Sequence, residues 1–359
     1  MFELMLSVCI LGDPSKCMER RVPMQQPMGI MACMRHGQSM AKRWLEAHPD
    51  LTLETWKCAA AEGRTPAPEP AAALAQFDVI EVAPGVFVHE GRVETVTPEN
   101  AGDIANFGFV IGPEAVAVID AGGSRRVGEA LMAEIRERTD LPVEWLILTH
   151  MHPDHVLGAS VFAEAGATVI GHAKLERALA ARAQSYVDNN RRLMGERAWG
   201  ATEVVLPEDG VAQRREIDLG GRVLELEAHP TAHTDNDLTV LDRQTGTFWV
   251  GDLVFQEHTP AIDGSILGWI SVLEEIKARE AARAVPGHGP VSIPWPGGAE
   301  PVSAYLLGLA SQVRTAIAEG ATMGEAIDHV GDDLRRDWRL FDEFHARNVS
   351  TVFQELEWE

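Results

Sequence analysis

The spacing of apolar residues predicts a chain that is rich in strands up to residue 250 and mostly helical after residue 302. Short apolar runs flank Pro84-Gly85 and Gly112-Pro113, which predicts two hairpins because proline and glycine favour the turns between paired strands. Apolar residues at helical spacing predict helices at 127–138 and 174–193. The predicted strands are 77–82, 86–88, 107–111, 115–119, 143–148, 168–170, 222–228, 238–241 and 248–250.

The last part of the chain, 297–359, has a helical pattern. Apolar residues recur at helical spacing in 305–313, 323–330 and 341–353, which predicts an extension that packs on the preceding domain or covers its site. His345 and Asn348 lie one turn apart in the last of these segments. We expect them to be exposed or capped helix residues, with a role in the site as the alternative.

Residues 1–58 are predicted to form a small separate module, and the Ala/Pro-rich segment 59–76 to be a linker to the domain at 77–296. In the module, a strand at 2–11 and a helix beginning at Ser39 flank a methionine-rich stretch. Thioethers can hold Cu(I), but methionines at this spacing are more often adaptable core residues. The stretch contains Met24, Met28, Met31, Cys33 and Met34.

The four cysteines, Cys9, Cys17, Cys33 and Cys58, all lie in this module. An even number in so small a segment favours two disulfides, because a small core needs covalent support. Three pairings are compatible with the sequence. Reduced, buried thiols in a cytosolic protein are the alternative, whereas the spacing lacks the CxxC pair of a zinc knuckle.

The chain is strongly acidic, with a formal net charge of −23 and a pI near 4.9. Such a field repels phosphate backbones, so nucleic acid is not an expected partner. No apolar run reaches the ~20 residues of a membrane span. The apolar opening, 1–12, lacks a basic start and contains Glu3, so it does not resemble a signal peptide. We expect either a cytosolic protein or a mature or truncated form.

The segment 149–155, THMHPDH, has the highest density of chemically active side chains. It follows a predicted strand and precedes a helical pattern, so it is a loop at the carboxyl end of a strand, where α/β folds place their sites. In an extended segment His150 and His152 point to the same side. The chain turns at the following proline, so Asp154 and His155 point elsewhere. Three imidazoles and a carboxylate within six residues predict a metal site.

Three later fragments complete this motif: Ala232-His233-Thr234, Gly251-Asp252 and Pro286-Gly287-His288-Gly289. In this order, over residues 77–296, the chain resembles the metallo-β-lactamase superfamily. The resemblance implies an α/β fold, the αββα sandwich, whose two β-rich halves each end in metal ligands. It also implies the metal ligands: His150, His152 and His233 for one ion, Asp154, His155 and His288 for a second, and Asp252 as the bridge.

Asp120 follows the predicted strand 115–119 and precedes Ala121-Gly122. The resemblance implies that Asp120 lies beneath the metal site as structural support and orients the loop that carries the histidines. On local grounds it could instead cap the helix that follows, because aspartate is common in such turns. The sequence leaves both interpretations open.

The chemistry of the ligands predicts hydrolysis. Imidazoles and carboxylates without a thiolate suit Zn²⁺, and also Fe or Mn. Two such ions, about 3.5–4 Å apart, generate hydroxide near neutral pH and polarise a carbonyl group. We therefore expect a dinuclear zinc hydrolase that cleaves an ester, thioester, lactone or lactam of a small-molecule substrate with a metal-bridging hydroxide. Asp154 is the expected catalytic residue, since it could orient this hydroxide and help to protonate the leaving group.

Asp252 also bears on the branch of the superfamily. The loops around His233 and His288 are similar to those of the β-lactamases, but β-lactamases with these loops usually have cysteine at the position of Asp252. An aspartate at this position is similar to the pattern of glyoxalase II and the lactonases. The run 251–269, the cysteine-containing module and the closing helix resemble the quinoprotein relay system zinc metallohydrolases and the metallohydrolases of sulfur-oxidation clusters. This second resemblance implies a periplasmic or secreted protein and no particular substrate.

Three residues that follow Asp252 are candidate substrate contacts: His258, Asp263 and Trp269. The alternative is a packed loop whose polar groups cap a helix that begins near Leu267. Since this run contains neither Lys nor Arg, it offers no partner for a substrate carboxylate.

Three other functions stay open. The first is a weak or true β-lactamase, and the second is a mononuclear iron dioxygenase of persulfides, which has the same fold but uses fewer of these ligands. The third is a non-enzymatic metal-binding accessory of a quinoprotein pathway. One bound iron instead of two zinc ions would identify the dioxygenase, and bound metal without turnover would identify the accessory protein. The sequence gives no indication of the oligomeric state.

Overall fold

The computed structural model describes residues 2–11, 13–22, 37–38, 40–45, 48–49, 51–60 and 77–359. The chain divides into two compact units, Met1–Pro70 and Ala71–Glu359. The methionine-rich stretch from Met24 to Met34, Cys33 and most of the predicted linker lie outside the described residues.

The N-terminal unit contains an antiparallel sheet with the strand order β2-β1-β3. Its strands are β1 (Phe2–Ile10), β2 (Asp13–Arg21) and β3 (Leu51–Ala60). Leu4, Leu6 and Val8 alternate along β1 and are fully buried, because successive side chains of a strand point to opposite faces. They pack with Ala41 from the helical residues 40–45.

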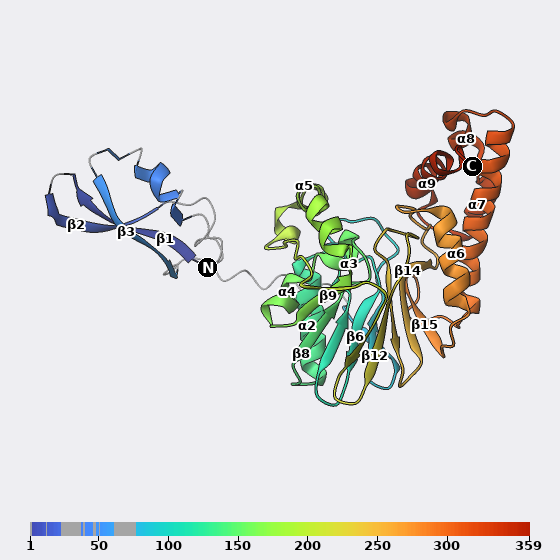
Figure 1. The fold of residues 1–359 in the computed structure, drawn as a ribbon, viewed down its shortest axis with the longest axis horizontal. Helices are drawn as coiled ribbons and strands as arrows, with labels where there is room; N and C mark the ends of the chain where they lie inside the picture. Colours follow the sequence, from blue (N-terminus) through green and yellow to red (C-terminus); the bar gives the residue numbers. More distant parts are fainter. Residues whose placement is uncertain are drawn as a thin grey trace. The chain divides into compact units, whose positions relative to one another are not determined.

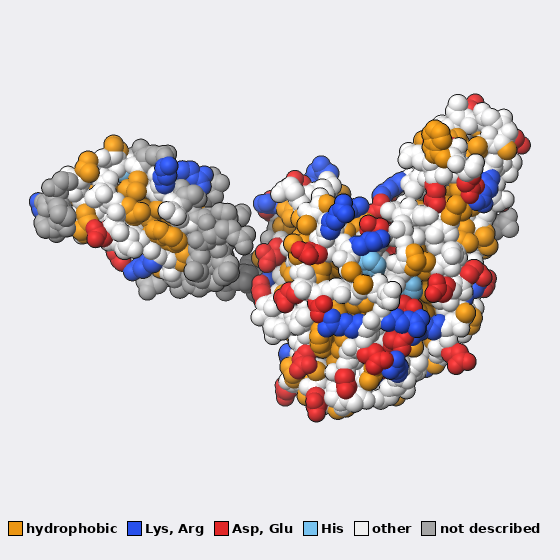
Figure 2. All heavy atoms as spheres, in the orientation of Figure 1, with side chains coloured by type: hydrophobic (Ala, Val, Ile, Leu, Met, Phe, Trp, Pro, Cys, Tyr) orange, Lys and Arg blue, Asp and Glu red, His pale blue; other side chains and the backbone are white. Residues whose placement is uncertain are grey.

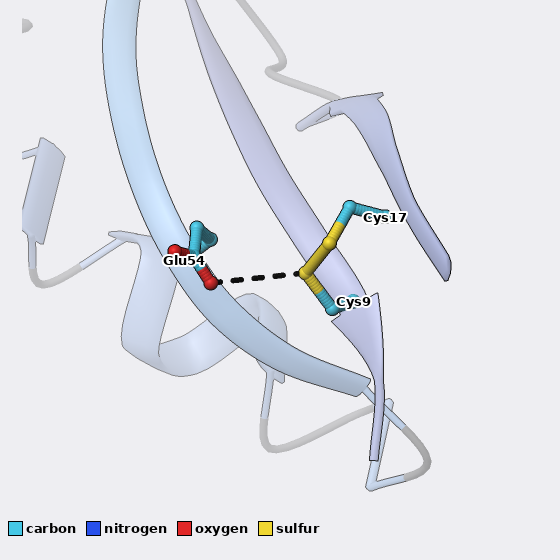
Figure 3. The surroundings of a disulfide bond; sticks show 3 residues. All are labelled: Cys9, Cys17 and Glu54. Carbon is cyan, nitrogen blue, oxygen red and sulfur yellow. Dashed lines mark hydrogen bonds between the residues drawn. A yellow bond between two sulfur atoms is a disulfide. The ribbon is translucent and has the colours of Figure 1, made fainter. Parts of the chain in front are cut away.

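A disulfide joins Cys9 of β1 to Cys17 of β2, at positions that pair directly in the sheet (Figure 3). Oε2 of Glu54, on β3, lies 3.8 Å from the Cys9 sulfur. A disulfide sulfur carries no proton, so this approach is a packing contact. Cys58 is also disulfide-bonded. The described cysteines therefore agree with the prediction of disulfides rather than with reduced thiols.

The second unit, from residue 77 onwards, is a four-layer αββα sandwich (Figure 1). Its first sheet has seven strands in the order β10-β9-β8-β7-β6-β5-β4, and its second sheet has five, in the order β11 to β15. The first sheet contains β4 (Val79–Ala83), β5 (Val86–His89), β6 (Phe107–Ile111), β7 (Val116–Ile119), β8 (Val143–Ile147), β9 (Thr168–His172) and β10 (Asp209–Val211). The second contains β11 (Arg214–Asp218), β12 (Val223–Ala228), β13 (Leu238–Asp242), β14 (Thr247–Phe255) and β15 (Arg283–His288).

Alternation along the strands of the first sheet supplies two separate cores. On β8, Leu146 packs outwards in the cluster that contains helix residues Leu131 and Ile135, whereas Ile147 packs inwards in the cluster that contains Leu226 of the second sheet. A strand covered on both faces needs apolar residues at successive positions. The continuous apolar run of β7 and the apolar second half of β8, from Trp145 to Ile147, follow from this requirement.

Helices cover the outer faces of both sheets. On the first sheet these are α2 (Arg125–Arg138), α4 (Ser160–Glu164) and α5 (Leu175–Trp199), where α5 is interrupted at Gly195 by a φ of 74°. The second sheet packs with α6 (Ile266–Lys277) and α7 (Glu300–Ala318). The remaining helices are α3 (Pro153–Val156), η1 (Gly297–Ala299), α8 (Met323–His329), η2 (Asp332–Asp337) and α9 (Phe341–Leu356). The predicted fold class is therefore confirmed.

The C-terminal helices belong to the same compact unit as the sandwich. Tyr305 and Leu309 of α7 and Val349 and Val352 of α9 are buried in one cluster with Trp269 of α6. This cluster continues beneath the second sheet through the strand residues of β14. Among the described residues, none of the helices has the length and apolar character needed to cross a membrane.

Candidate metal centre

The seven predicted ligands lie at one edge of the sandwich, where the strands of both sheets end. His150 and His152 occupy the loop after β8, and Asp154 and His155 lie on the one-turn helix α3. Pro153 is the first residue of this helix, a position that does not need an N–H donor. The chain therefore changes direction between the two pairs of ligands, as the sequence predicted.

The second sheet provides the other three ligands. His233 lies in the loop after β12, Asp252 within β14, and His288 at the end of β15. The glycines beside two of these ligands are required by the packing. A Cβ atom on Gly287 would lie 1.8 Å from Oδ1 of Asp252, and Gly251 has a φ of 50°, which side chains rarely adopt.

The seven side chains form two groups. Within each group, all ligand atoms lie within 4.8 Å of one another. The first group contains His150, His152, His233 and Asp252, and the second contains Asp154, His155 and His288. The Asp252 carboxylate contacts both groups. Its Oδ2 lies 3.5 Å from His150 Nε2 and 3.4 Å from His233 Nε2. Its Oδ1 lies 3.1 Å from His155 Nε2, and His288 Nε2 is 3.4 Å from Oδ2.

Hydrogen bonds on the outer side fix the orientation of the imidazoles. In four of them Nδ1 faces an oxygen acceptor, so it carries the proton and Nε2 presents its lone pair to the centre. The four contacts are His150 Nδ1 to Thr149 Oγ1 (3.0 Å), His155 Nδ1 to Asp120 Oδ2 (2.8 Å), His233 Nδ1 to Ala261 O (2.7 Å) and His288 Nδ1 to Ile104 O (2.9 Å).

His152 has the opposite orientation. Its Nε2 donates to Asp263 Oδ2 at 3.1 Å, so Nδ1 is the atom that faces the centre, 3.0 Å from His233 Nε2. Asp263 was predicted as a substrate contact, and the structure places it behind a metal-ligand candidate. Its other oxygen, Oδ1, pairs with Arg347 of α9 at 3.1 Å.

Asp120 lies at the end of β7 beneath the loop with the histidines. Its Oδ1 accepts a hydrogen bond from the N–H of Thr149, and its Oδ2 accepts one from the Thr149 hydroxyl, both at 2.7 Å. It has a φ of 58°, which is uncommon for a residue with a side chain and is typical of functional sites. Helix α2 is capped by Ser124. Asp120 therefore supports the loop and does not cap the helix.

Three buried atoms in the centre have no hydrogen-bonding partner among the described residues: His150 Nε2, His155 Nε2 and Asp252 Oδ1. Each is a good metal ligand. His155 Nε2 lies 3.1 Å from Asp252 Oδ1, and His150 Nε2 lies 3.5 Å from the other oxygen of that carboxylate, without the alignment of a hydrogen bond. Unpaired polar atoms are costly in a buried site. A cation would satisfy all three, so the residues fit the metal that this donor set implies.

The environment makes the ligands unequal as proton acceptors. Burial, together with the neighbouring His152, lowers the pKa of His233 to about 3, and burial also lowers the pKa of His150. Burial would lower the pKa of His155 too, but Asp252 and Asp120 outweigh it and raise that pKa. The surrounding histidines hold the pKa of Asp252 well below its usual range in spite of burial. A carboxylate that stays ionised is the natural bridge between two cations.

Two predicted substrate contacts are buried. The Trp269 side chain is inaccessible; its Nε1 donates to Leu253 O at 3.0 Å, and its ring centre lies 5.0 Å from that of His233. His258 is 3% exposed, packs 4.7 Å from the His288 ring, and has a pKa that burial lowers to about 4. Neither side chain reaches the surface in this structure. Ser265 caps α6 through Gly268 N, as the packed-loop interpretation expects.

The last helix brings Arg347, which the sequence did not assign to the site, to this edge, and it buries His345 and Asn348, which were expected to be exposed or capped. Arg347 is exposed and reaches Asp263, and Asn348 is buried and contacts the loop that contains Asp263. His345, beside them, is also buried. Nothing local could have shown this, because the partners are separated by more than eighty positions. Figure 2 shows histidine side chains at the surface of this edge, beside Lys and Arg side chains.

The αββα sandwich and the His/Asp cluster at its edge are the features of a metal-dependent hydrolase. The family model of the Metallo-beta-lactamase superfamily matches residues 101–288, more than half of the chain, and the chain belongs to this superfamily. The predicted resemblance to the superfamily is confirmed.

Three known proteins illustrate the relationship. A linear primary-alkylsulfatase of Pseudomonas sp. is 36% identical over 50 residues, 14% of this chain and 10% of that protein. The beta-lactamase-like protein 2 homolog of Caenorhabditis elegans is 23% identical over 51% of this chain and 55% of its own length. The chain thus spans about half or less of these relatives. A solved metallo-beta-lactamase from Pontibacter korlensis shares the fold, with a TM-score of 0.52, 20% identity, and coverage of 65% of this chain and 99% of that one.

Proposed function

We propose that the protein is a dinuclear zinc hydrolase. The observation that carries this proposal is the position of Asp252, whose single carboxylate lies within 3.5 Å of ligand nitrogens from both groups. One metal would be held by His150, His152 and His233, and the other by Asp154, His155 and His288. When bound, two such ions would supply a hydroxide nucleophile near neutral pH and polarise the bond to be cleaved.

Asp154 is the ligand best placed to handle a proton. Its side chain is 16% exposed, more than Asp252 at 3%, and its Oδ2 lies 3.4 Å from His288 Nε2. A carboxylate at the open side of the centre can orient the nucleophile and pass a proton to the leaving group. Asp252 is enclosed by four imidazoles and therefore suits a purely bridging role.

The proposed substrate is a neutral or weakly charged ester, thioester, lactone or lactam. The chain carries a net charge of −23, which gives no long-range attraction to anions. The cation nearest to Asp263, Arg347, already forms an ion pair with that carboxylate. The aspartate at position 252, where many β-lactamases have cysteine, also favours this class over an efficient β-lactamase.

A second candidate substrate is an alkyl sulfate ester. It is supported by Arg347, whose side chain is 65% exposed beside the centre and could turn towards an anionic group. The local likeness to a linear primary-alkylsulfatase points in the same direction. The mononuclear iron alternative has less support, because all seven ligand positions face the centre.

Metal analysis combined with a substrate panel tests the proposal. Protein purified with zinc should contain two metals per chain, and should hydrolyse an acyl ester or acyl thioester in a chelator-sensitive way. A stoichiometry that stays at one metal under saturating zinc would exclude the dinuclear centre. One bound iron with persulfide oxidation would indicate the dioxygenase, and two metals without turnover of any ester, thioester, lactone, lactam or sulfate would indicate an accessory protein.

We also propose that the protein works in an oxidising compartment, such as the periplasm, or outside the cell. Cys9–Cys17 and the disulfide at Cys58 support this proposal, because structural disulfides persist in such compartments. Fractionation of the source cells, with a cytosolic marker enzyme as the control, tests it. Recovery of the protein with the cytosolic marker would contradict it.

A further inference from the structure

The loop 258–265 lies between the metal centre and the last helix, and Asn348 of α9 holds its middle. The Asn348 Oδ1 accepts a hydrogen bond from Ile262 N at 3.0 Å, and its Nδ2 donates to Pro260 O at 2.6 Å. Asn348 is only 1% exposed. Its amide therefore binds the backbone on both sides of Ala261.

Glu355, two turns further along α9, holds the end of the same loop. Its Oε1 accepts from the Ser265 hydroxyl at 2.6 Å, and its Oε2 accepts from Ile266 N at 2.8 Å. A carboxylate at the first N–H groups of α6 is also favoured by the helix dipole. The loop is thus fixed to α9 at two points.

A buried chain of hydrogen bonds fixes the Asn348 side chain in turn. Its Nδ2 also donates to the Tyr305 hydroxyl at 2.9 Å, and this hydroxyl faces His345 Nδ1 at 2.9 Å. His345 Nε2 donates to Val330 O at 2.8 Å, so Nδ1 is free to accept from Tyr305. Each proton has an acceptor, and α7 and α9 are joined behind the loop.

The hydrogen bonds from the loop to the ligands go to two histidines of the first group, whereas its His258 ring packs against His288 of the second group without a hydrogen bond to it. Ala261 O accepts from His233 Nδ1, and Asp263 Oδ2 accepts from His152 Nε2. The outer partners of His155 and His288 are Asp120 and Ile104, which lie in the first half of the sandwich domain.

We propose that α9 is a positioning element for the first metal site. Asn348 and Glu355 hold Ala261 and Asp263 where they orient His233 and His152, so the C-terminal helix determines the affinity of the first site and leaves the second site unchanged. This inference rests on the proposed two-metal function. Partners behind metal ligands typically affect metal affinity 10- to 100-fold, and a backbone carbonyl can be such a partner only if its loop is fixed.

The test measures each site separately. In His288→Ala protein, only the first site keeps its full ligand set, and in His233→Ala protein, only the second does. Co²⁺ is the probe, and its affinity is measured by competition with a chromophoric chelator, independently of activity. We expect Asn348→Ala to weaken Co²⁺ binding about 10- to 100-fold in the His288→Ala background and to leave it unchanged in the His233→Ala background.

Val352→Ala is the matched control. Val352 lies on the same helix and is buried in the same core, but its side chain has no hydrogen-bonding groups. It should destabilise the fold without changing Co²⁺ affinity in either background. If Asn348→Ala does not fold, Glu355→Ala decides, because Glu355 is partly exposed and its loss should weaken the first site in the same way.

The outcomes separate the two proposals. If the wild-type protein binds two ions and neither Asn348→Ala nor Glu355→Ala changes the first site, the role of α9 is wrong and the dinuclear centre stands. An equal loss at both sites would also contradict the role of α9. If the wild-type protein fails to bind two ions, the dinuclear centre itself is wrong.

Discussion

His155 Nδ1 lies 2.8 Å from Asp120 Oδ2, and both side chains are buried. The same carboxylate accepts two hydrogen bonds from Thr149, the residue before His150. The Thr149 hydroxyl donates to Asp120 and accepts from His150 Nδ1. One carboxylate directly after β7 therefore orients a histidine of each metal group.

Replacement of Asp120 by Asn should weaken both metal sites. Oδ1 of Asp120 accepts from the N–H of Thr149, and Oδ2 accepts from the Thr149 hydroxyl and His155 Nδ1. An amide can accept at only one of these two positions, so its NH₂ group would face a donor at the other. We expect metal affinity or kcat/KM to fall about 10- to 100-fold, the usual effect of removing such a partner. Chelator competition measures the affinity, and Asp140→Asn, at an exposed position after α2, is the control. An unchanged affinity would show that the loop holds its shape without Asp120.

Replacement of Asp252 by Asn keeps the volume but removes the charge between the two ions. We expect activity to fall roughly 10²-fold or more, chiefly because the second metal is bound more weakly. Metal content after dialysis and kcat/KM at saturating zinc distinguish lost metal from lost chemistry. Wild-type turnover in this variant would mean that Asp252 is only a residue of β14.

The geometry of the motif at 149–155 could be predicted from its own sequence, because the end of a strand and the proline that follows determine the directions of its four metal-ligating side chains. The other ligands come from distant segments, and only the resemblance to a family brought His233, Asp252 and His288 together. The role of Asp263 was predicted as a substrate contact because its position follows Asp252 along the chain. Its partner His152 and its ion pair with Arg347 depend on tertiary packing, which no local pattern encodes.

The burial of Trp269 could not be predicted for the same reason. An aromatic residue near a site is consistent with a pocket or with a core, and the choice depends on α7 and α9 covering α6. Helix α5 gives the opposite case. The apolar pattern ended near residue 193, and the helix is interrupted at Gly195, where φ is positive. The sequence shows a glycine that can interrupt a helix, but it does not show which distant helices will pack over a given residue.

Stability should fall in mild acid because of His229. Burial lowers its pKa from 6.5 to about 4, and its Nε2 lies 2.8 Å from Thr239 Oγ1. The unfolded chain binds a proton near pH 6.5 and the folded chain does not, so unfolding takes up a proton between these pH values. Neutral His229 therefore contributes about 3 kcal/mol to the free energy of unfolding. This contribution is present above pH 6.5 and is lost as the pH falls towards 4.

Urea unfolding of metal-free protein between pH 4 and 7 checks this effect. His229→Gln keeps a hydrogen-bonding group for Thr239 but cannot titrate. The variant should therefore lose less stability than the wild type as the pH falls through this window. Parallel stability profiles for the two proteins would contradict the assignment to His229.

Reduction should affect only the N-terminal unit. Residues Ala71–Glu359 contain no cysteine, whereas Cys9–Cys17 closes a short loop between paired strands. Loss of a disulfide that closes so short a loop should cost about 2–3 kcal/mol. Hydrogen exchange of the full chain with and without a phosphine reductant should show faster exchange in β1 and β2 and unchanged exchange around the metal centre. Slow exchange of β1 after reduction would show that the sheet does not depend on the bond.

The ranking of substrates depends on whether Arg347 is available. Its ion pair with Asp263 neutralises the cation that a β-lactam carboxylate would need. We therefore expect kcat/KM for an acyl thioester or ester to exceed that for a β-lactam, whose hydrolysis should be slow, with a high KM, and abolished by chelator and by His150→Ala. Arg347→Ala should change thioester turnover little, whereas a substrate that recruits this cation should lose affinity. A kcat/KM of about 10⁶ M⁻¹s⁻¹ or above for a β-lactam would overturn this ranking. Efficient cleavage of an alkyl sulfate that is lost in Arg347→Ala would instead favour the sulfate ester, because it would show that the cation leaves Asp263 to bind the substrate anion.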